Sequence, residues 1–339
     1  MTDLSTTYMG IPLRNPLLVG ASPLTANVES IQQIEAMGAG AIVTPSLFEE
    51  QIQLERFEFD ETLHREEARS AEMTTVVPHL QHGGPREHLF WVKKAKEAVR
   101  IPVIASLNAV AKETWLEYAK RLEDTGVDGL ECNLFASPRE GRQPGEAVER
   151  EQIELIHALK QAVTIPLSVK LSSFYTNPLD VVHRMDEAGA SAFVLFNRLF
   201  DPEIDIHQEH SALAFSLSRE TDHRLPLRYA GLLAGSIQAD ICSSTGIFTG
   251  EDIVRMILAG ATTVQTVSTL LRHGLSHIQV MLQQLTEWME ARGYNSLPAF
   301  RGKLSHRNNR DPWVYTRAQY VKLLMDPKGF MTKPSGRID

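Results

Sequence analysis

Short runs of apolar residues recur along this chain, and most of them follow a helical stretch that ends in glycine or in an Ile-Pro pair. Glycine just past the end of a helix adopts a left-handed conformation that other residues resist, so each repeat predicts a helix, a tight connection and a strand. The eight predicted strands lie within residues 15–21, 41–43, 103–106, 129–131, 167–170, 192–194, 239–243 and 263–265.

The predicted strands are almost continuously apolar, whereas a strand with one face in water alternates apolar and polar residues. Burial on both faces is typical of parallel strands, and strands that alternate with helices form βαβ units. Eight such units in 339 residues favour a closed barrel over an open doubly wound sheet, and no GxGxxG motif follows the first strand. We therefore predict the α/β class, with a (β/α)8 barrel over residues 1–304.

Three segments do not fit the repeat. Two are long insertions after the second and sixth strands, at residues 47–86 and 198–225. Long connections that follow barrel strands lie at the catalytic face and often form lids. The third is a C-terminal extension, residues 305–339, in which Asp-Pro predicts the start of a helix over residues 311–324. We expect this helix to pack on the barrel or on a partner subunit.

The composition restricts the partners and the compartment. The net charge is −8 and the basic residues are scattered, so neither nucleic acid nor an anionic membrane is expected as a partner. The two cysteines, Cys132 and Cys242, are too few for a disulfide framework and match no zinc or iron–sulfur spacing. No signal-like segment opens the chain and no apolar run is long enough to span a membrane, which predicts a cytoplasmic protein.

Small or polar residues follow the predicted strands. The C-terminal ends of barrel strands meet at one face, where the catalytic groups of such folds lie. The candidate site residues at these ends are Ala21, Ser22, Asn108, Asn133, Lys170, Asn197, Ser244, Thr245, Gly246, Val267 and Ser268.

The loops after the last two strands predict a phosphate site. Small residues at 244–246 and 267–268 would let the backbone approach a phosphate closely, and barrels bind phosphate at this place through backbone amides and a helix N-terminus. The alternative is that these are two ordinary loops rich in serine, threonine and glycine.

Lys170 ends an apolar strand, and burial of an ammonium is costly unless an anion pairs with it. Three interpretations are open. Lys170 balances the negative charge that develops at N1 and O2 of a reduced flavin, forms a Schiff base as in a class I aldolase, or pairs with Glu131 on the adjacent strand. Asn133 and Asn197 offer donors and acceptors that suit an amide- or imide-bearing ring such as a flavin or a pyrimidine.

Several of these residues stand in motifs that resemble the dihydroorotate dehydrogenases, specifically the soluble class 1 type, over roughly residues 8–304. The matching segments are Asn-Pro-Leu-Leu at 15–18 with Ala-Ser at 21–22, Glu-Cys-Asn-Leu at 131–134 followed by Ser-Pro at 137–138, Pro-Leu-Ser-Val-Lys-Leu at 166–171, Ser-Thr-Gly-Ile-Phe-Thr-Gly at 244–250, Ala-Gly-Ala at 259–261, Gly-Tyr at 293–294 and Phe-Arg-Gly-Lys-Leu at 300–304.

The resemblance implies an FMN enzyme that oxidises dihydroorotate to orotate in pyrimidine biosynthesis. Asn133 would touch flavin or substrate, Lys170 would lie at the N1 side of the flavin, and Thr245, Gly246 and Ser268 would hold the phosphate. In that family a Cys or Ser after the fourth strand removes a substrate proton while hydride passes to flavin N5. The motif favours Ser137 for this role, and an alignment without a gap would place Ala136 there. A homodimer and an electron-transfer partner are expected.

Three departures from the family pattern leave other functions open. The family's Gly-Gly phosphate motif is reduced to Thr-Gly at 245–246. Pro45 stands where the family has a lysine, and residues 77–84 lack the asparagines of the family's substrate loop. The alternatives are a catalytically altered flavoprotein with another substrate, a phosphate-binding lyase with Lys170 as Schiff base, and a degenerate barrel kept as a binding or assembly subunit.

Overall fold

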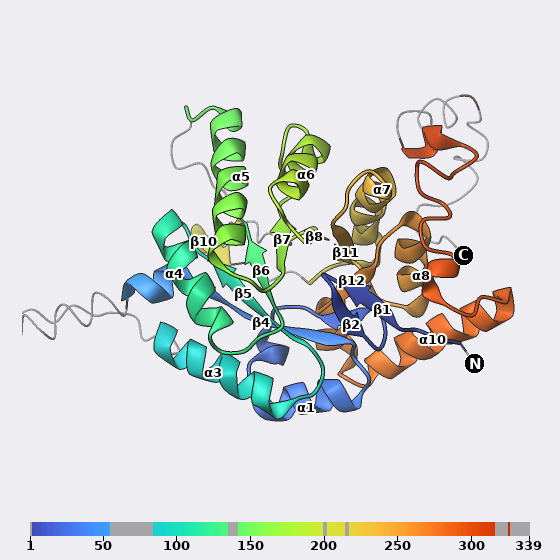
Figure 1. Ribbon diagram of the computed structural model, residues 1–339, viewed down its shortest axis with the longest axis horizontal. Helices are drawn as coiled ribbons and strands as arrows, with labels where there is room; N and C mark the ends of the chain where they lie inside the picture. Colours follow the sequence, from blue (N-terminus) through green and yellow to red (C-terminus); the bar gives the residue numbers. More distant parts are fainter. Residues whose placement is uncertain are drawn as a thin grey trace, which may run out of the picture.

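Eight strands pair side by side as a closed parallel barrel in the computed structural model (Figure 1), which describes residues 2–54, 84–134, 142–198, 202–213, 217–315 and 325. The strands are β3 (Leu17–Val19), β4 (Ala41–Phe48), β5 (Val103–Asn108), β6 (Gly129–Asn133), β7 (Leu167–Leu171), β8 (Ala192–Leu195), β11 (Asp240–Ser244) and β12 (Thr263–Thr266). They follow one another in the order β11-β12-β3-β4-β5-β6-β7-β8, and β8 pairs with β11 to close the barrel. The predicted (β/α)8 barrel is confirmed, and each predicted strand overlaps an observed one.

Helices surround the barrel (Figure 1) and cover its outer face with apolar side chains. They are α1 (Val28–Ala36), α3 (Pro85–Ala98), α4 (Lys112–Glu123), α5 (Gly145–Ala162), α6 (Pro178–Glu187), α7 (Arg224–Leu233), α8 (Gly250–Ala259), the short α9 (Ser268–His273) and α10 (His277–Arg292). On α10, Met281, Leu285 and Met289 recur every four residues and are fully buried in the main core. Burial of each such side chain stabilises the fold by roughly 1.5–3 kcal/mol, which fixes the helix against its neighbours.

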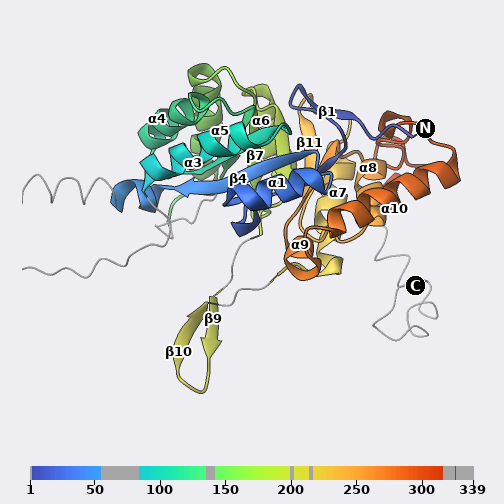
Figure 2. The same ribbon diagram turned by 90° about the horizontal axis from the view of Figure 1, so that it is seen from below.

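A second, smaller hydrophobic core fills the inside of the barrel. Its barrel residues include Leu18 and Ile104, and the hairpin of β1 (Thr6–Tyr8) and β2 (Ile11–Leu13) adds Tyr8 to it. Figure 2 shows this hairpin at one end of the barrel and α9 toward the other. The hairpin therefore covers the end where the strands begin, and the end where the strands finish remains for a site.

Both predicted insertions follow their barrel strands. In the first, residues 47–86, β4 runs on to Phe48, residues 49–54 are helical, and residues 55–83 lie outside the described part of the chain. The second contains the antiparallel hairpin of β9 (Pro202–Asp205) and β10 (His210–Leu213), which extends away from the barrel on the side of α9 (Figure 2). The insertions thus leave the barrel at the end opposite to the β1–β2 hairpin.

The C-terminal extension is described as far as residue 315. A 3-10 helix, Pro312–Tyr315, stands where the helix over residues 311–324 was predicted to begin, and the remainder lies outside the described residues apart from residue 325. Tyr315 lies on α7, so close that a Cβ at Gly231 would stand 2.1 Å from its ring. The described part of the extension therefore packs on the barrel helices, while the division of the chain at residue 304 stays a prediction.

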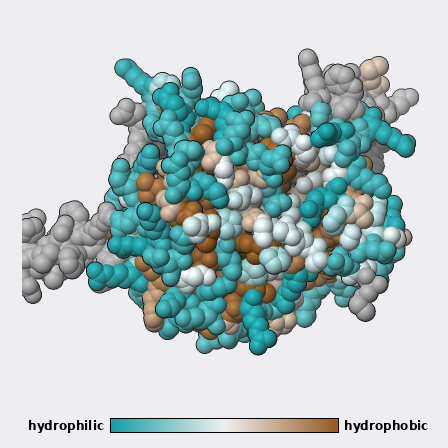
Figure 3. All heavy atoms as spheres, viewed as in Figure 1, coloured by the Kyte–Doolittle hydropathy of each residue, from teal (hydrophilic) through white to brown (hydrophobic). Residues whose placement is uncertain are grey.

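Polar residues cover most of the periphery of the face in Figure 3, and hydrophobic residues are scattered among them. No helix in the described ranges is both long and apolar enough to cross a bilayer. The same ranges hold no group of three or more His, Cys, Asp or Glu side chains that could bind a metal ion.

Candidate functional site

A pocket of about 1070 Å³ opens at the end of the barrel where the strands finish. This volume is at the upper end of the range for small-molecule and cofactor sites. Every candidate site residue in the described part of the chain lines it, namely Ala21, Ser22, Asn108, Asn133, Lys170, Asn197, Ser244, Thr245, Gly246, Val267 and Ser268. Ser137 lies in residues 135–141, outside the described residues. The structure thus brings the candidates together, and their individual roles stay predictions.

Lys170 and Gln265 line the floor of the pocket, and both contact the buried Glu131 carboxylate. Lys170 Nζ lies 3.4 Å from Glu131 Oε1 and donates to Gln265 Oε1 at 3.4 Å. Gln265 Nε2 in turn donates to Glu131 Oε2 at 2.5 Å. Lys170 is 8% exposed and Glu131 only 1% exposed, so the ion pair is buried with Lys170 on the side of the pocket.

The ion pair between Lys170 and Glu131 was one of the three interpretations open from the sequence, and it is present in the structure. Gln265 was missed. The signal for it was a lone amide within the apolar eighth strand, but only closure of the barrel places β12 opposite β6 and brings Gln265 to Glu131. An interior polar contact across a barrel depends on strand order and shear, which a single strand does not reveal.

The two thiols are chemically inert. Burial raises the pKa of Cys242 to about 12. Burial, together with the neighbouring Glu131 carboxylate, raises the pKa of Cys132 well above its ordinary value. Because the thiolate is the reactive form, neither cysteine acts as a nucleophile at neutral pH. Cys132 is therefore a small buried side chain, in agreement with its position inside an apolar strand.

Three asparagines form a linked group on one wall. Asn197 Nδ2 donates to Asn133 Oδ1 at 2.9 Å, and Asn108 Nδ2 donates to the backbone oxygen of Asn133 at 3.1 Å. Asn133 Nδ2 and Asn197 Oδ1 take part in no hydrogen bond among the described residues. The pair therefore presents one amide donor and one amide acceptor, the pattern that complements an N–H beside a C=O in a ring.

The turn after β11 approaches neighbouring backbone closely. Thr245 and Gly246 both have left-handed conformations, with φ of 79° and 75°. A Cβ at Gly246 would lie 2.3 Å from the backbone nitrogen of His223, so only glycine fits there. Thr266 Oγ1 donates to the backbone oxygen of Ile247 at 3.1 Å, which holds this turn beside the turn after β12. The two loops predicted to share a phosphate are therefore neighbours.

The amides at the start of α8 are already occupied. Asp252 Oδ2 accepts from the backbone nitrogens of Phe248 and Thr249 at 3.0 and 2.9 Å. The Gly250 amide donates to Gln284 Oε1 at 2.7 Å. In contrast, no hydrogen bond among the described residues engages the amide of Gly246. An anion at this end of the pocket would therefore meet the turn that precedes α8, not the helix start.

The wall formed by the end of β4, the helical residues 49–54 and α3 (the β4–α3 wall) was not predicted. It carries Phe48, Glu50, Glu87 and Trp91, and Pro45 lies beside them. The indole Nε1 of Trp91 is buried without a hydrogen-bond partner among the described residues. These side chains were not predictable from the sequence because they belong to an insertion and a helix, and the packing of both against the barrel depends on the tertiary structure.

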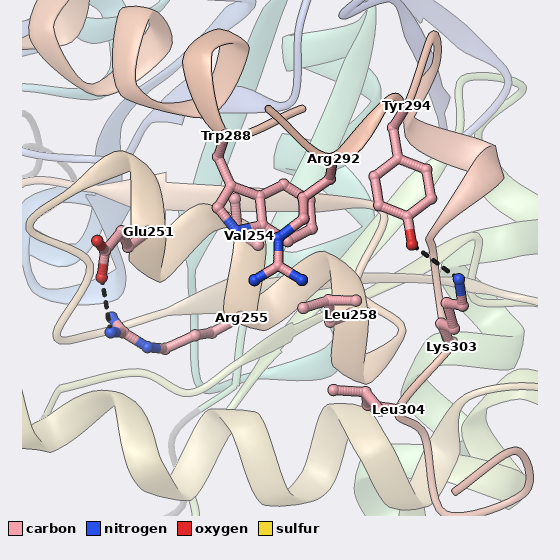
Figure 4. Close-up of a pocket in the computed structure, with 9 residues that line it drawn as sticks. All are labelled: Glu251, Val254, Arg255, Leu258, Trp288, Arg292, Tyr294, Lys303 and Leu304. Atoms are coloured by element: carbon pink, nitrogen blue, oxygen red, sulfur yellow. Dashed lines mark hydrogen bonds and ion pairs between the residues drawn. The ribbon is translucent and has the colours of Figure 1, made fainter. Parts of the chain in front are cut away.

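A second hollow, of about 630 Å³, lies on the outside of the barrel between α8 and α10 (Figure 4). Its polar side chains pair with one another: Glu251 and Arg255 lie 2.9 Å apart, and Lys303 Nζ donates to Tyr294 Oη at 2.7 Å (Figure 4). None of the candidate residues lines it. The pocket at the barrel mouth is therefore the candidate active site.

Comparison with known proteins gives one family. The sequence profile of the dihydroorotate dehydrogenase family matches residues 76–289. The chain is 26% identical over 308 residues to dihydroorotate dehydrogenase B (NAD(+)), catalytic subunit, of Thermoplasma volcanium, which covers 89% of this chain and 98% of that protein. It is 29% identical over 238 residues to a putative dihydroorotate dehydrogenase A (fumarate) of Aeropyrum pernix, covering 67% and 75% of the two chains. The chloroplastic dihydropyrimidine dehydrogenase (NADP(+)) of Arabidopsis thaliana is 22% identical over 326 residues, covering 88% and 76%.

Proposed function

Since this chain belongs to the dihydroorotate dehydrogenase family, and with it to the oxidoreductases that act on CH–CH bonds, we propose that it oxidises dihydroorotate to orotate with FMN held at the barrel mouth. The observation that carries the proposal is the convergence of the candidate residues on one large pocket with a buried cation at its floor. Such convergence is what a cofactor site requires.

The donor set of the pocket fits the parts of FMN. At one end the turn of residues 244–246 presents a close backbone approach and an available amide, which suits a phosphate. At the floor the Lys170 ammonium suits a group that gains negative charge. When bound, FMN would supply the two-electron oxidation, and the residues of this chain would orient the ring and the substrate.

The substrate would lie against the asparagine group at the ends of β5, β6 and β8. Asn133 Nδ2 and Asn197 Oδ1 would bind an N–H beside a C=O of the dihydropyrimidine ring. Ser137 is the proposed base that removes the substrate proton. Because a serine hydroxyl holds its proton tightly, a water or a second side chain would have to accept that proton from Ser137.

A second candidate substrate is a dihydropyrimidine without a carboxylate. Two carboxylates, Glu50 and Glu87, stand on the β4–α3 wall, and no lysine or arginine lines that wall within the described residues. Arg198 lines the pocket elsewhere, but its guanidinium pairs with Asp222 at 2.7 Å. A substrate carboxylate would be repelled by this wall, whereas a neutral ring would not.

The lyase alternative is less well supported. A Schiff-base lysine must present its amine to the substrate carbonyl, whereas Lys170 Nζ is engaged in an ion pair with the buried Glu131 carboxylate at 3.4 Å. Borohydride treatment with a carbonyl substrate should therefore leave no reduced adduct on Lys170.

One experiment separates the candidates. The purified protein should show a flavin spectrum, or gain one with added FMN, and anaerobic dihydroorotate should bleach it. Bleaching by dihydrouracil but not by dihydroorotate would select the second candidate substrate. A protein that binds no FMN would refute the flavin assignment altogether and favour a binding or assembly role.

We also propose that the chain forms a homodimer in the cytoplasm and passes electrons to a second subunit. The relatives named as catalytic subunits support the partner, because that term is used of one chain among several. Size-exclusion chromatography with light scattering would measure the oligomeric state, and affinity purification from the native cell would identify a bound partner.

A further inference from the structure

The floor of the pocket contains more than the lysine that a flavin site needs. Glu131 on β6 and Gln265 on β12 stand on strands four places apart in the eight-stranded ring, which is the opposite side of the barrel. Their side chains nevertheless meet, at 2.5 Å between Gln265 Nε2 and Glu131 Oε2. The contact therefore spans the barrel interior directly beneath the pocket, and Lys170 closes it into a triangle.

The Glu131 carboxylate is held at both oxygens. Oε2 accepts from Gln265, and Oε1 faces the ammonium of Lys170. An isolated buried carboxylate is strongly disfavoured, and so is an isolated buried ammonium. Each charge is therefore tolerated in the barrel because the other is present, and Gln265 fixes their relative position.

We propose that Glu131 is the positioning residue that keeps Lys170 charged at the floor of the pocket, and that Gln265 holds Glu131 in place for this purpose. The functional consequence of this inference rests on the proposed function, because the charge of Lys170 would tune the reduction of the bound flavin ring. Its physical basis, the pairing of buried charges, is independent of any ligand.

The first test measures the charge of Lys170 without flavin. Acetic anhydride acylates neutral amines only, so the labelling rate at Lys170, read by mass spectrometry, reports the neutral fraction. A nearby opposite charge changes proton affinity by about ten- to a thousandfold. In the full-length protein freed of cofactor, Glu131→Gln should raise the labelling rate of Lys170 at least tenfold relative to surface lysines, and Glu131→Asp should stay close to wild type.

Ser168→Ala is the matched control. Ser168 lies two residues before Lys170 on the same strand, is buried, and contacts the backbone oxygen of Leu130 and the Tyr8 hydroxyl, not Glu131 or Lys170. Its removal changes the same interior without touching the ion pair, so the labelling rate should not change. Gln265→Leu should increase the labelling rate of Lys170 by an intermediate amount, because the Glu131 carboxylate remains but loses the hydrogen bond that fixes its position.

The second test measures the midpoint potential of bound FMN against pH. At acidic pH, Glu131→Gln leaves the Lys170 charge without its counter-charge, so reduction should become at least tenfold more favourable, about 30 mV for a two-electron couple.

The outcomes of the two tests are separable. If Glu131→Gln folds, shown by an unchanged circular dichroism spectrum, and labels at the wild-type rate, the positioning role is refuted whether or not FMN binds. If Glu131→Gln does not fold, Glu131→Asp and Gln265→Leu decide: equal labelling in both would refute it. Absence of FMN binding with increased labelling would support the role of Glu131 and refute the proposed function.

Discussion

At the scale of single residues, Gly246 offers a sharp test of the turn after β11. Its φ is 75°, and a Cβ would lie 2.3 Å from the backbone nitrogen of His223. Gly246→Ala therefore adds a steric clash to the roughly 1–2 kcal/mol that a left-handed alanine costs. We expect FMN affinity to fall at least tenfold, measured by fluorescence titration, and the free energy of unfolding to fall by more than the conformational cost alone.

Gly10→Ala is the matched control for this substitution. Gly10 has nearly the same φ, 79°, but an added Cβ there meets no atom within 4 Å, and Gly10 stands in the hairpin at the far end of the barrel. The Gly10→Ala variant should lose only the stability that a left-handed alanine costs, and it should bind FMN as the wild type does. Equal losses of FMN affinity in both variants would show that the turn of residues 244–246 has no special contact with the cofactor.

At the scale of elements, Glu49 anchors the start of the first insertion to the loop before α4. Its carboxylate accepts from the Val110 amide at 2.9 Å and from Thr114 Oγ1 at 3.1 Å, and it is 4% exposed. Burial alone would raise the pKa of Glu49, but these hydrogen bonds outweigh it and lower that pKa below 4.5. Glu49→Gln should therefore lower the free energy of unfolding by about 1.5–3 kcal/mol near neutral pH.

The stabilisation by Glu49 should depend on pH, and the direction of its pKa shift fixes the sign of that dependence. Because the folded-state pKa of Glu49 is depressed, its stabilisation is fully present above the unfolded value of 4.5 and is lost as the pH falls through the folded value. The free energies of unfolding of wild type and Glu49→Gln, measured with urea, should thus differ at neutral pH and become equal in acid. The neighbouring Glu50→Gln, at an exposed position, should leave stability unchanged, and a difference that persists in acid would contradict the anchoring role.

The strands could be predicted from the sequence, whereas some of the residues in the pocket could not. The strands were predictable because a glycine or Ile-Pro connection before a continuous apolar run is a local signal, and strand ends in a barrel converge by geometry. The partner of Lys170 on the adjacent strand followed from the same reasoning. Gln265 and Trp91 were not predictable, since one depends on which strands face each other and the other on where an insertion returns to the barrel.

At the scale of the whole molecule, the pocket is built from the ends of strands all around the barrel, so a ligand there joins distant parts of the chain. A ligand that binds only the folded state stabilises it by RT ln(1 + [L]/Kd), about 2.7 kcal/mol at a hundredfold excess over Kd. FMN at that concentration should raise the free energy of unfolding by this amount. The measurement is urea unfolding of the flavin-free protein with increasing FMN.

Riboflavin separates the two ends of the pocket, because it carries the same ring as FMN without the phosphate. The turns after β11 and β12 are held together by the Thr266–Ile247 hydrogen bond and would contact only the phosphate. If they contribute at least tenfold to affinity, riboflavin at the same concentration should stabilise the protein by at most about 1.4 kcal/mol. Equal stabilisation by the two flavins would mean that the ring alone is bound, and the phosphate site would have to lie elsewhere or not exist.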